Sequence, residues 1–265
     1  MNLVNFHCHY SHSNFNNHII RDNQNTSRIF YICCCLDDNN LTDLTEEVIK
    51  YNHLYIKTNS DIQDNEKETY KDFNNIFACA GQHPLYPQDE IFYNHIITLL
   101  DNNELFAIGE IGFDKRNKDF NAQKKIFLKY CDLATQYNKP IVIHCVGYYY
   151  ELFKILKHNF QNTIKIFHSF CPSLEITKTL KNQLNTDNVI ISFNHRILKI
   201  KNSKIILKYI IKNFNYAFET DQTYTYFPEV DYNLSSLIYN IALKIKQDSQ
   251  ILYKKQWEVF KSLSD

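Results

Sequence analysis

The chain has 265 residues, of which 44% are hydrophobic and 22% charged, and its 29 basic and 29 acidic side chains cancel to a net charge of zero. A chain of this length can bury a substantial core without disulfides or structural metals. No apolar run approaches the roughly 20 residues of a membrane span, and no signal peptide is visible at the start. The balanced charge also argues against a protein that coats nucleic acid through its overall charge, though not against an enzyme that binds phosphate groups locally. We expect one domain over residues 1–265, cytoplasmic, with no membrane association and no protein partner indicated.

Short apolar runs recur along the chain, and we expect each to be a buried strand. In chain order they cover residues 3–4, 29–36, 76–80, 105–108, 141–143, 164–167, 189–193 and 216–218. Most lead to a residue that can bind a metal or move a proton, namely His7 and His9, His83, Glu110, His144, His168, His195 and Asp221.

Stretches of helical period separate these runs. We predict helices over residues 88–100, 120–137, 148–158, 173–184 and 203–213, closing helices within 233–263, and a polar, irregular region at 52–75. The histidines and the glutamate that follow the apolar runs are spaced as in a strand–helix repeat. Successive intervals of 27, 34 and 24 positions separate His83, Glu110, His144 and His168. Eight strands alternating with helices predict an α/β fold of the (β/α)₈ TIM-barrel type.

The eight cysteines are expected to be reduced core residues, because none forms a CxxC pair and three of them lie in the run at 29–36. A thiolate metal site is the alternative, for which the sequence offers no ligand spacing. Only four glycines occur, where about 19 would be average, and each lies within three residues of a His or Glu. We expect them to form tight turns around a shared site.

In a barrel, the residues at the strand ends emerge on one face and converge. Taken singly, a strand-end histidine is more often a hydrogen-bonded core or surface group, and Asp221 alone could cap a helix. Because six such residues fall at the same point of the repeat, a joint site for one or two divalent ions is favoured. A carboxylate that bridges two ions is chemically reasonable, since only an anionic, bidentate group can serve both. His195 fits the repeat less well and is left out of the predicted site.

These motifs resemble the TatD family of metal-dependent deoxyribonucleases, within the amidohydrolase-like barrels. The resemblance covers nearly the whole chain and lies in FHCH at 6–9, GQHP at 81–84, AIGEIGFD at 107–114, PIVIH at 140–144, HSF at 168–170 and ETD at 219–221. The segment 107–114, followed by Gln123 and by His144, is the most specific part.

The resemblance implies a role for each residue of the motifs. It implies one ion held by His7, His9, Glu110 and Asp221, and a second held by Glu110, His144 and His168. It places His83 against the scissile phosphate and Asp114 at the family's second acidic position, so both are predicted to bind substrate. The chain departs from the family pattern at Asn5, at Pro172-Ser173, at Gln222-Thr223 and in lacking an arginine shortly after His144. It therefore resembles a divergent member of the family.

The resulting hypothesis is hydrolysis of DNA phosphodiester bonds in an exonuclease-like manner, at single strands or frayed ends, with Mg²⁺ or Mn²⁺ as the favoured ions and Zn²⁺ tolerated by the histidines. Glu110, Asp221 and His83 are the predicted catalytic residues. The alternatives are hydrolysis of another bond (a small phosphoester, an amide or an ester) on the same metal site, or a protein that retains metal without turnover.

Overall fold

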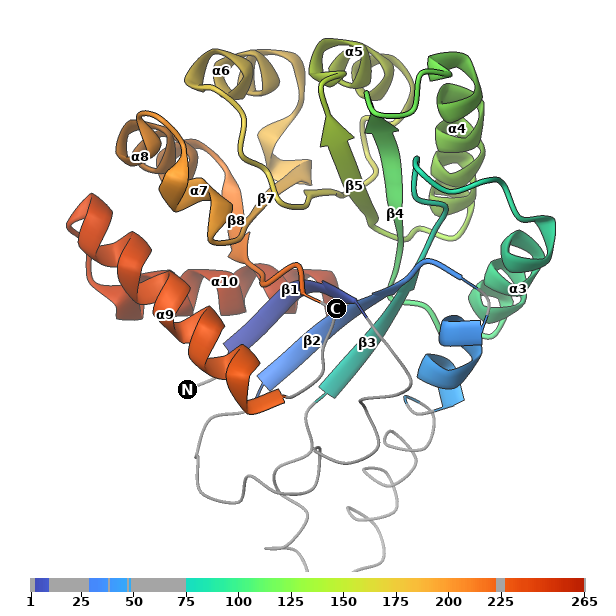
Figure 1. Cartoon of the computed structure of the whole chain (residues 1–265), viewed down its shortest axis with the longest axis horizontal. Helices are drawn as coiled ribbons and strands as arrows, with labels where there is room; N and C mark the ends of the chain where they lie inside the picture. The colour runs from blue at the N-terminus through green and yellow to red at the C-terminus, as the bar shows by residue number, and fades with distance from the viewer. Residues whose placement is uncertain are drawn as a thin grey trace, which may run out of the picture.

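Eight parallel strands follow one another around a single sheet in the order of the chain (Figure 1). The structure is a computed structural model, and it describes residues 3–9, 29–37, 39–46, 48, 75–222 and 227–264. The strands are β1 Leu3–His9, β2 Ile29–Cys35, β3 Asn75–Ala80, β4 Ala107–Asp114, β5 Ile141–Val146, β6 Lys165–Phe167, β7 Val189–Phe193 and β8 Asn215–Phe218. The predicted (β/α)₈ barrel is confirmed.

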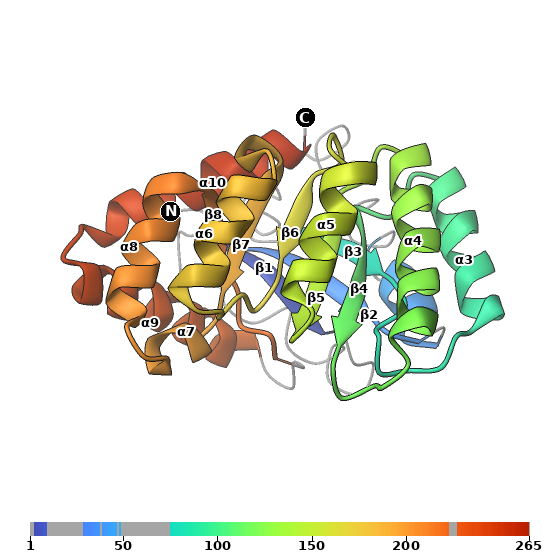
Figure 2. The same cartoon turned by 90° about the horizontal axis from the view of Figure 1, so that it is seen from above.

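Helices connect the strands and lie outside them, as Figure 2 shows for α3 to α6 and α8. Their bounds are α3 Glu90–Asp101, α4 Phe120–Gln136, α5 Tyr149–Asn159, α6 Leu174–Gln183, α7 Arg196–Lys199, α8 Ser203–Asn213, α9 Phe227–Ile245 and α10 Ser249–Ser264. The five predicted inner helices are confirmed to within two residues at each end. The irregular region expected at 52–75 lies outside the described residues, apart from Asn75, which begins β3. Within the described chain, no helix has both the length and the apolar character to cross a bilayer.

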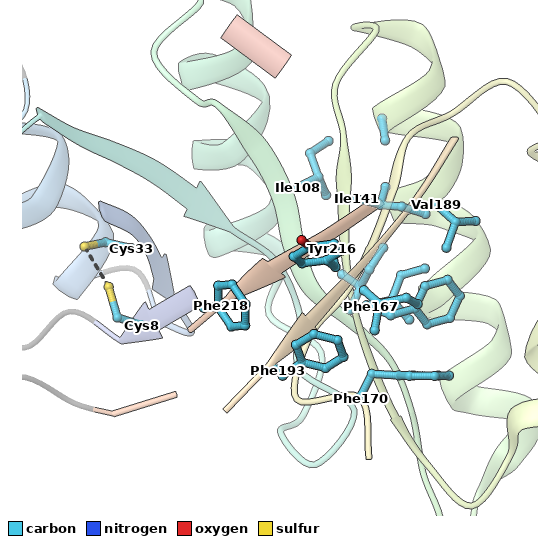
Figure 3. Close-up of a cluster of buried hydrophobic side chains, with 14 of the residues drawn as sticks. Cys8, Cys33, Ile108, Ile141, Phe167, Phe170, Val189, Phe193, Tyr216 and Phe218 are labelled. Carbon is cyan, nitrogen blue, oxygen red and sulfur yellow. Dashed lines mark hydrogen bonds between the residues drawn. The ribbon is translucent and has the colours of Figure 1, made fainter. Parts of the chain in front are cut away.

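Alternation along the strands divides the core into two layers. In β2, Phe30, Ile32 and Cys34 belong to a cluster inside the barrel, whereas the residues between them pack outward against the helices. Phe260 of α10 joins the inner cluster and packs on Phe30, so α10 covers one end of the barrel. Figure 3 shows part of the outer layer, where Phe167, Phe193 and Phe218 lie close together. Because both layers are apolar, the sequences of these strands are continuous hydrophobic runs.

Two β-bulges break this alternation where the site begins. The register of β1 on β2 shifts between Asn5 and Cys8, and the register of β4 on β5 shifts between Gly109 and Ile111. A bulge adds one residue to a strand and so re-aims the side chains that follow it. The strands were expected to end before their site residues, but His7, Glu110 and His144 lie within β1, β4 and β5.

The barrel closes between β1 and the segment that follows β8. The backbone N–H of Asp221 donates to the carbonyl of His7 at 3.1 Å, and the N–H of His9 donates to the carbonyl of Gln222 at 3.0 Å. The buried Asn5 side chain exchanges two hydrogen bonds with Thr220, accepting from its backbone N–H and donating to its hydroxyl. An amide supplies the donor and the acceptor that this pairing needs, which gives the departure from the family pattern at Asn5 a structural role.

The glycines do not all form turns, as the sequence had suggested, because Gly109 and Gly112 lie inside β4. Gly112 has a φ of +145°, and a Cβ there would lie 1.9 Å from the carbonyl oxygen of His144 on β5. A larger residue would therefore force β4 and β5 apart at the point where both carry site residues. Close backbone approach, rather than chain reversal, explains this glycine.

We expect Gly112→Ala to lower the free energy of unfolding by about 3 kcal/mol, because backbone must move to admit the methyl group. Gly147→Ala is the matched control and should lose less stability: Gly147 also has a positive φ, of +93°, so both variants share the backbone strain, but its Cβ would meet the flexible side chain of Lys115 rather than backbone. Urea denaturation of both variants tests this. Equal losses for the two would show that the contact with β5 is not the constraint.

Candidate metal centre

The carboxylate of Glu110 lies at the centre of the converging side chains. It is 2% exposed, and its two oxygens face two separate groups of histidines. Burial opposes its ionisation, but the charge of His168 and hydrogen bonds from His144 and His168 outweigh burial and hold the pKa of Glu110 well below its usual value. Glu110 is therefore an ionised, buried carboxylate shared by both groups.

The first group gathers around the Oε2 atom of Glu110. His7 Nε2 and His9 Nε2 lie 3.6 and 3.7 Å from that oxygen, and 3.8 and 3.6 Å from Oδ1 of Asp221. The residues come from β1, β4 and the turn after β8, where Asp221 adopts a φ of +55°. The arrangement brings together all four residues that were predicted to hold the first ion.

The second group gathers around the Oε1 atom of Glu110. His144 Nδ1 lies 2.8 Å and His168 Nε2 lies 2.5 Å from that oxygen, and the two ring nitrogens are 3.2 Å apart. His83 Nε2 stands further out, 3.7 Å from Oε1. The three residues predicted for the second ion are thus also brought together, with His83 beside them.

The donor atoms present fit a divalent cation. His7 Nε2 is buried and has no hydrogen-bond partner within the described chain, although it faces two carboxylate oxygens. Burial lowers the pKa of His7 well below its ordinary value, which keeps the ring neutral and a ligand. Burial lowers the pKa of His168 too, but Glu110 and Glu219 raise it well above its usual value, so the site favours positive charge at this point. Imidazole nitrogens with carboxylate oxygens suit Mn²⁺ and Zn²⁺, and the carboxylates suit Mg²⁺.

Asp114 contacts His144 on the side of the ring that faces away from Glu110 and so orients it. The carboxylate is fully buried, and its Oδ2 lies 2.9 Å from His144 Nε2, the ring nitrogen opposite the Nδ1 that faces Glu110. Arg116 binds the same carboxylate through Nε, and the side chain of Gln123 holds the backbone on both sides of the Asp114 α-carbon. A carboxylate behind a ligand histidine fixes its tautomer and direction. The substrate contact expected of Asp114 stays a prediction, because Arg116, not Asp114, lines the cavity.

Other supporting residues were not identified from the sequence as members of the site. Glu219 accepts from the backbone N–H of Ser169 at 2.6 Å and lies 3.6 Å from His168 Nδ1, opposite the nitrogen that faces Glu110. Asn194 donates to Oδ2 of Asp221 at 3.2 Å. Both carried a signal in the sequence: Glu219 begins the ETD motif, and Asn194 directly follows the apolar run at 189–193, although neither was assigned to the site.

The cysteines support the site without forming a metal group. All eight are free and six are buried, as expected. Cys34 Sγ lies 3.2 Å from His7 Nδ1, on the side of the ring away from the carboxylates. Among the described residues, the side-chain groups that could hold a metal are built from histidines and carboxylates alone. The thiolate alternative therefore finds no support in this part of the chain.

His83 has a defined tautomer. Its Nδ1 accepts from the backbone N–H of Leu85 at 3.2 Å, and burial lowers its pKa to about 4 despite the opposing charge of Glu110. A neutral ring that accepts at Nδ1 carries its proton on Nε2, and that atom faces the site. His83 is therefore a hydrogen-bond donor at neutral pH.

The site lies on the wall of a cavity of about 460 Å³ at the carboxyl ends of the strands. Glu110, Asp221 and four histidines line it, together with Arg116, Arg196 and Tyr149. His195 is not among the lining residues, in agreement with its exclusion from the predicted site. The cavity is large enough for a substrate group to reach both clusters of ligands.

The sequence profile of the family described as TatD related DNase matches residues 4–263. The chain belongs to this family. A metal-dependent hydrolase of Methanocaldococcus jannaschii, described as uncharacterized, is 28% identical over 71% of this chain and 76% of its own length. A similarly described protein of Buchnera aphidicola is 25% identical over 64% of this chain and 62% of its own. The chain is thus a metal-dependent hydrolase of the TatD type.

Solved structures agree on the fold. The TatD homologue YjjV of Escherichia coli superposes with a TM-score of 0.68 at 16% identity, covering 98% of this chain and 97% of that one. An uncharacterized amidohydrolase of Saccharomyces cerevisiae gives a TM-score of 0.66 at 13% identity, covering 98% and 99%. At these identities the likeness concerns the barrel alone.

We expect Mn²⁺ to raise the melting temperature of the TatD-type chain by about 5 °C or more at roughly hundredfold excess over its dissociation constant, because the ion binds only the folded site. Glu110→Gln removes the shared charge and should abolish the shift. Glu90→Gln, on the surface of α3, is the matched control and should retain it. A full shift in the Glu110 variant would place the ion elsewhere.

Proposed function

We propose that this chain hydrolyses phosphodiester bonds of DNA, at single strands or frayed ends, with one or two Mg²⁺ or Mn²⁺ ions. The observation that carries the proposal is the buried Glu110 carboxylate, shared by two groups of ligands on the wall of one cavity. Two adjacent cation sites suit in-line displacement at phosphorus, because both the attacking and the leaving oxygen need stabilisation.

Bound divalent ions would lower the pKa of a water molecule and neutralise charge on the phosphoryl group. Asp221 would accept the proton of that water. Burial opposes its ionisation, but the adjacent His9 ring and the charge of His168 outweigh burial and lower its pKa to about 2. The carboxylate is therefore ionised at neutral pH and ready to receive a proton.

His83 supplies a neutral donor on the other side of the site. Its Nε2–H faces the cavity and can donate to a phosphoryl oxygen as negative charge develops there. The backbone N–H of Leu85 holds the ring in place through Nδ1.

DNA as the substrate is supported by the family to which the chain belongs and by local features of the cavity. Tyr86 is 52% exposed beside the His83 ring, with 5.4 Å between ring centroids, and offers a face on which an unpaired base can stack. The net charge of zero favours an enzyme that holds one strand end over a protein that follows a long duplex.

Degradation of end-labelled single-stranded DNA by the purified protein with Mg²⁺ or Mn²⁺ tests the proposal. We expect a ladder of shortened products that disappears with EDTA and in Glu110→Gln, and that persists in Glu90→Gln. Activity surviving in the Glu110 variant would mean a contaminant or another site. Absence of cleavage by folded, metal-loaded protein would leave the hydrolase class standing and redirect the search to other phosphoesters, amides and esters.

We expect His83→Ala to lower kcat by about 100-fold, the usual contribution of a positioned proton donor. The Mn²⁺-induced rise in melting temperature should remain, because His83 is assigned to the substrate and not to the metal. His83→Gln, which restores a donor, should recover part of the rate. Because the pKa of His83 is about 4, its titration should leave no inflection in the rate between pH 6 and 8. Loss of the thermal shift in His83→Ala would instead identify His83 as a ligand.

A further inference from the structure

Two arginines stand at the mouth of the metal centre. Arg116 follows the end of β4, and Arg196 begins α7 just after β7. Their side chains are 63% and 71% exposed, yet both line the cavity that contains Glu110 and Asp221. Among the lining residues that the structure describes, they are the only lysine or arginine side chains.

Arg116 is held by a carboxylate of the site. Its Nε lies 3.0 Å from each oxygen of Asp114, its Nη2 lies 2.5 Å from Oδ2, and its backbone N–H also donates to Asp114. Asp114 is buried and fixed by His144, so the guanidinium is anchored by one edge. A long, exposed side chain would otherwise sample many rotamers.

Arg196 also contacts a carboxylate of the site, through longer contacts than those of Arg116. Its Nη1 donates to the hydroxyl of Ser169 at 3.2 Å, and its Nη2 lies 3.4 Å from Oδ2 of Asp221. The other oxygen of Asp221, Oδ1, faces His7 and His9. One carboxylate thus faces the predicted ion with one oxygen and Arg196 with the other.

Each guanidinium has N–H donors left over after these contacts, and they can bind a ligand. Arginine carries five N–H groups, and the contacts within the described chain engage Nε and Nη2 of Arg116, and Nη1 and Nη2 of Arg196. An isolated surface ion pair contributes little to stability. Two anchored pairs on one cavity are better explained by preorganisation for an anion, because a guanidinium matches the geometry of phosphate oxygens.

We propose that Arg116 and Arg196 form a two-sided clamp that binds the charged oxygens of the substrate's phosphate groups over the metal centre. The clamp would offset the repulsion between a phosphodiester and the carboxylates of the metal centre. It would therefore favour phosphate esters over neutral amides and esters. The inference rests on the proposed function and adds to it two residues that bind the phosphate groups of the substrate.

Equilibrium binding tests the clamp without requiring turnover. The probe is a fluorescein-labelled, six-nucleotide single strand with phosphorothioate linkages, which keep the negative charge and slow hydrolysis. Its anisotropy is measured against Mg²⁺-loaded protein. A methylphosphonate strand of the same sequence, whose backbone is neutral, is the reference ligand.

We expect Arg196→Ala to weaken binding of the charged strand about tenfold or more, the effect of losing a charge-assisted hydrogen bond. Binding of the neutral strand should change little. Arg116→Ala should behave alike, and Arg196→Lys, which keeps the charge but not the fork, should be intermediate. Lys199→Ala on α7 and Lys118→Ala near Arg116 are matched exposed controls and should bind as the unmodified chain does.

The Mn²⁺-induced thermal shift, measured on each variant, separates anion binding from damage to the metal ligands. The proposal predicts that the shift is retained in Arg196→Ala, while KM for a cleavable strand rises more than kcat falls. Equal affinity of the unmodified chain and both alanine variants for the charged strand would overturn the clamp, even if the protein cleaves DNA. Arginine-dependent binding without any cleavage would support the clamp and refute the nuclease assignment.

Discussion

The arrangement of the site depends on one buried carboxylate. Glu110 is surrounded by the rings of five histidines from four strands or strand ends, and each of its oxygens serves a different group of them. An ionised carboxylate is stable in this interior only if positive or hydrogen-bonding partners surround it. The histidines around Glu110 meet this need for positive or hydrogen-bonding partners, and a divalent cation between them would meet it as well.

Backbone geometry directs this carboxylate. A bulge in β4 turns Glu110 toward the centre, and a bulge in β1 turns His7 and His9 the same way after Phe6 has faced the inner core. Gly112 allows β4 to approach β5 closely enough for His144 to reach Glu110. The closing contacts between β1 and the turn after β8 then bring Asp221 beside His7. The site therefore depends on the register of four strands more than on any one motif.

A second set of residues holds the ligands in position. Asp114 stands behind His144, Glu219 behind His168 and Cys34 behind His7. Each contacts the ring nitrogen that points away from Glu110, so each ligand presents the other nitrogen to the centre. Arg116 and Arg196 extend the network to the mouth of the cavity, where they couple the ligand carboxylates to the place where substrate would enter.

The sequence by itself determined the strand–helix alternation, because hydrophobic period is a local property, and through strand-end polarity and motifs it indicated the six residues that the structure gathers around Glu110. It also indicated Gln123 and Glu219 through their motifs, without their contacts. Only the tertiary structure decided that Gly109 and Gly112 lie within a strand, that Asp114 is buried beneath Arg116, and that Asn194 and Arg196 reach Asp221. Those facts follow from bulges, strand register and barrel closure. Such features arise from contacts between strands far apart in the chain, and no local pattern of residues encodes them.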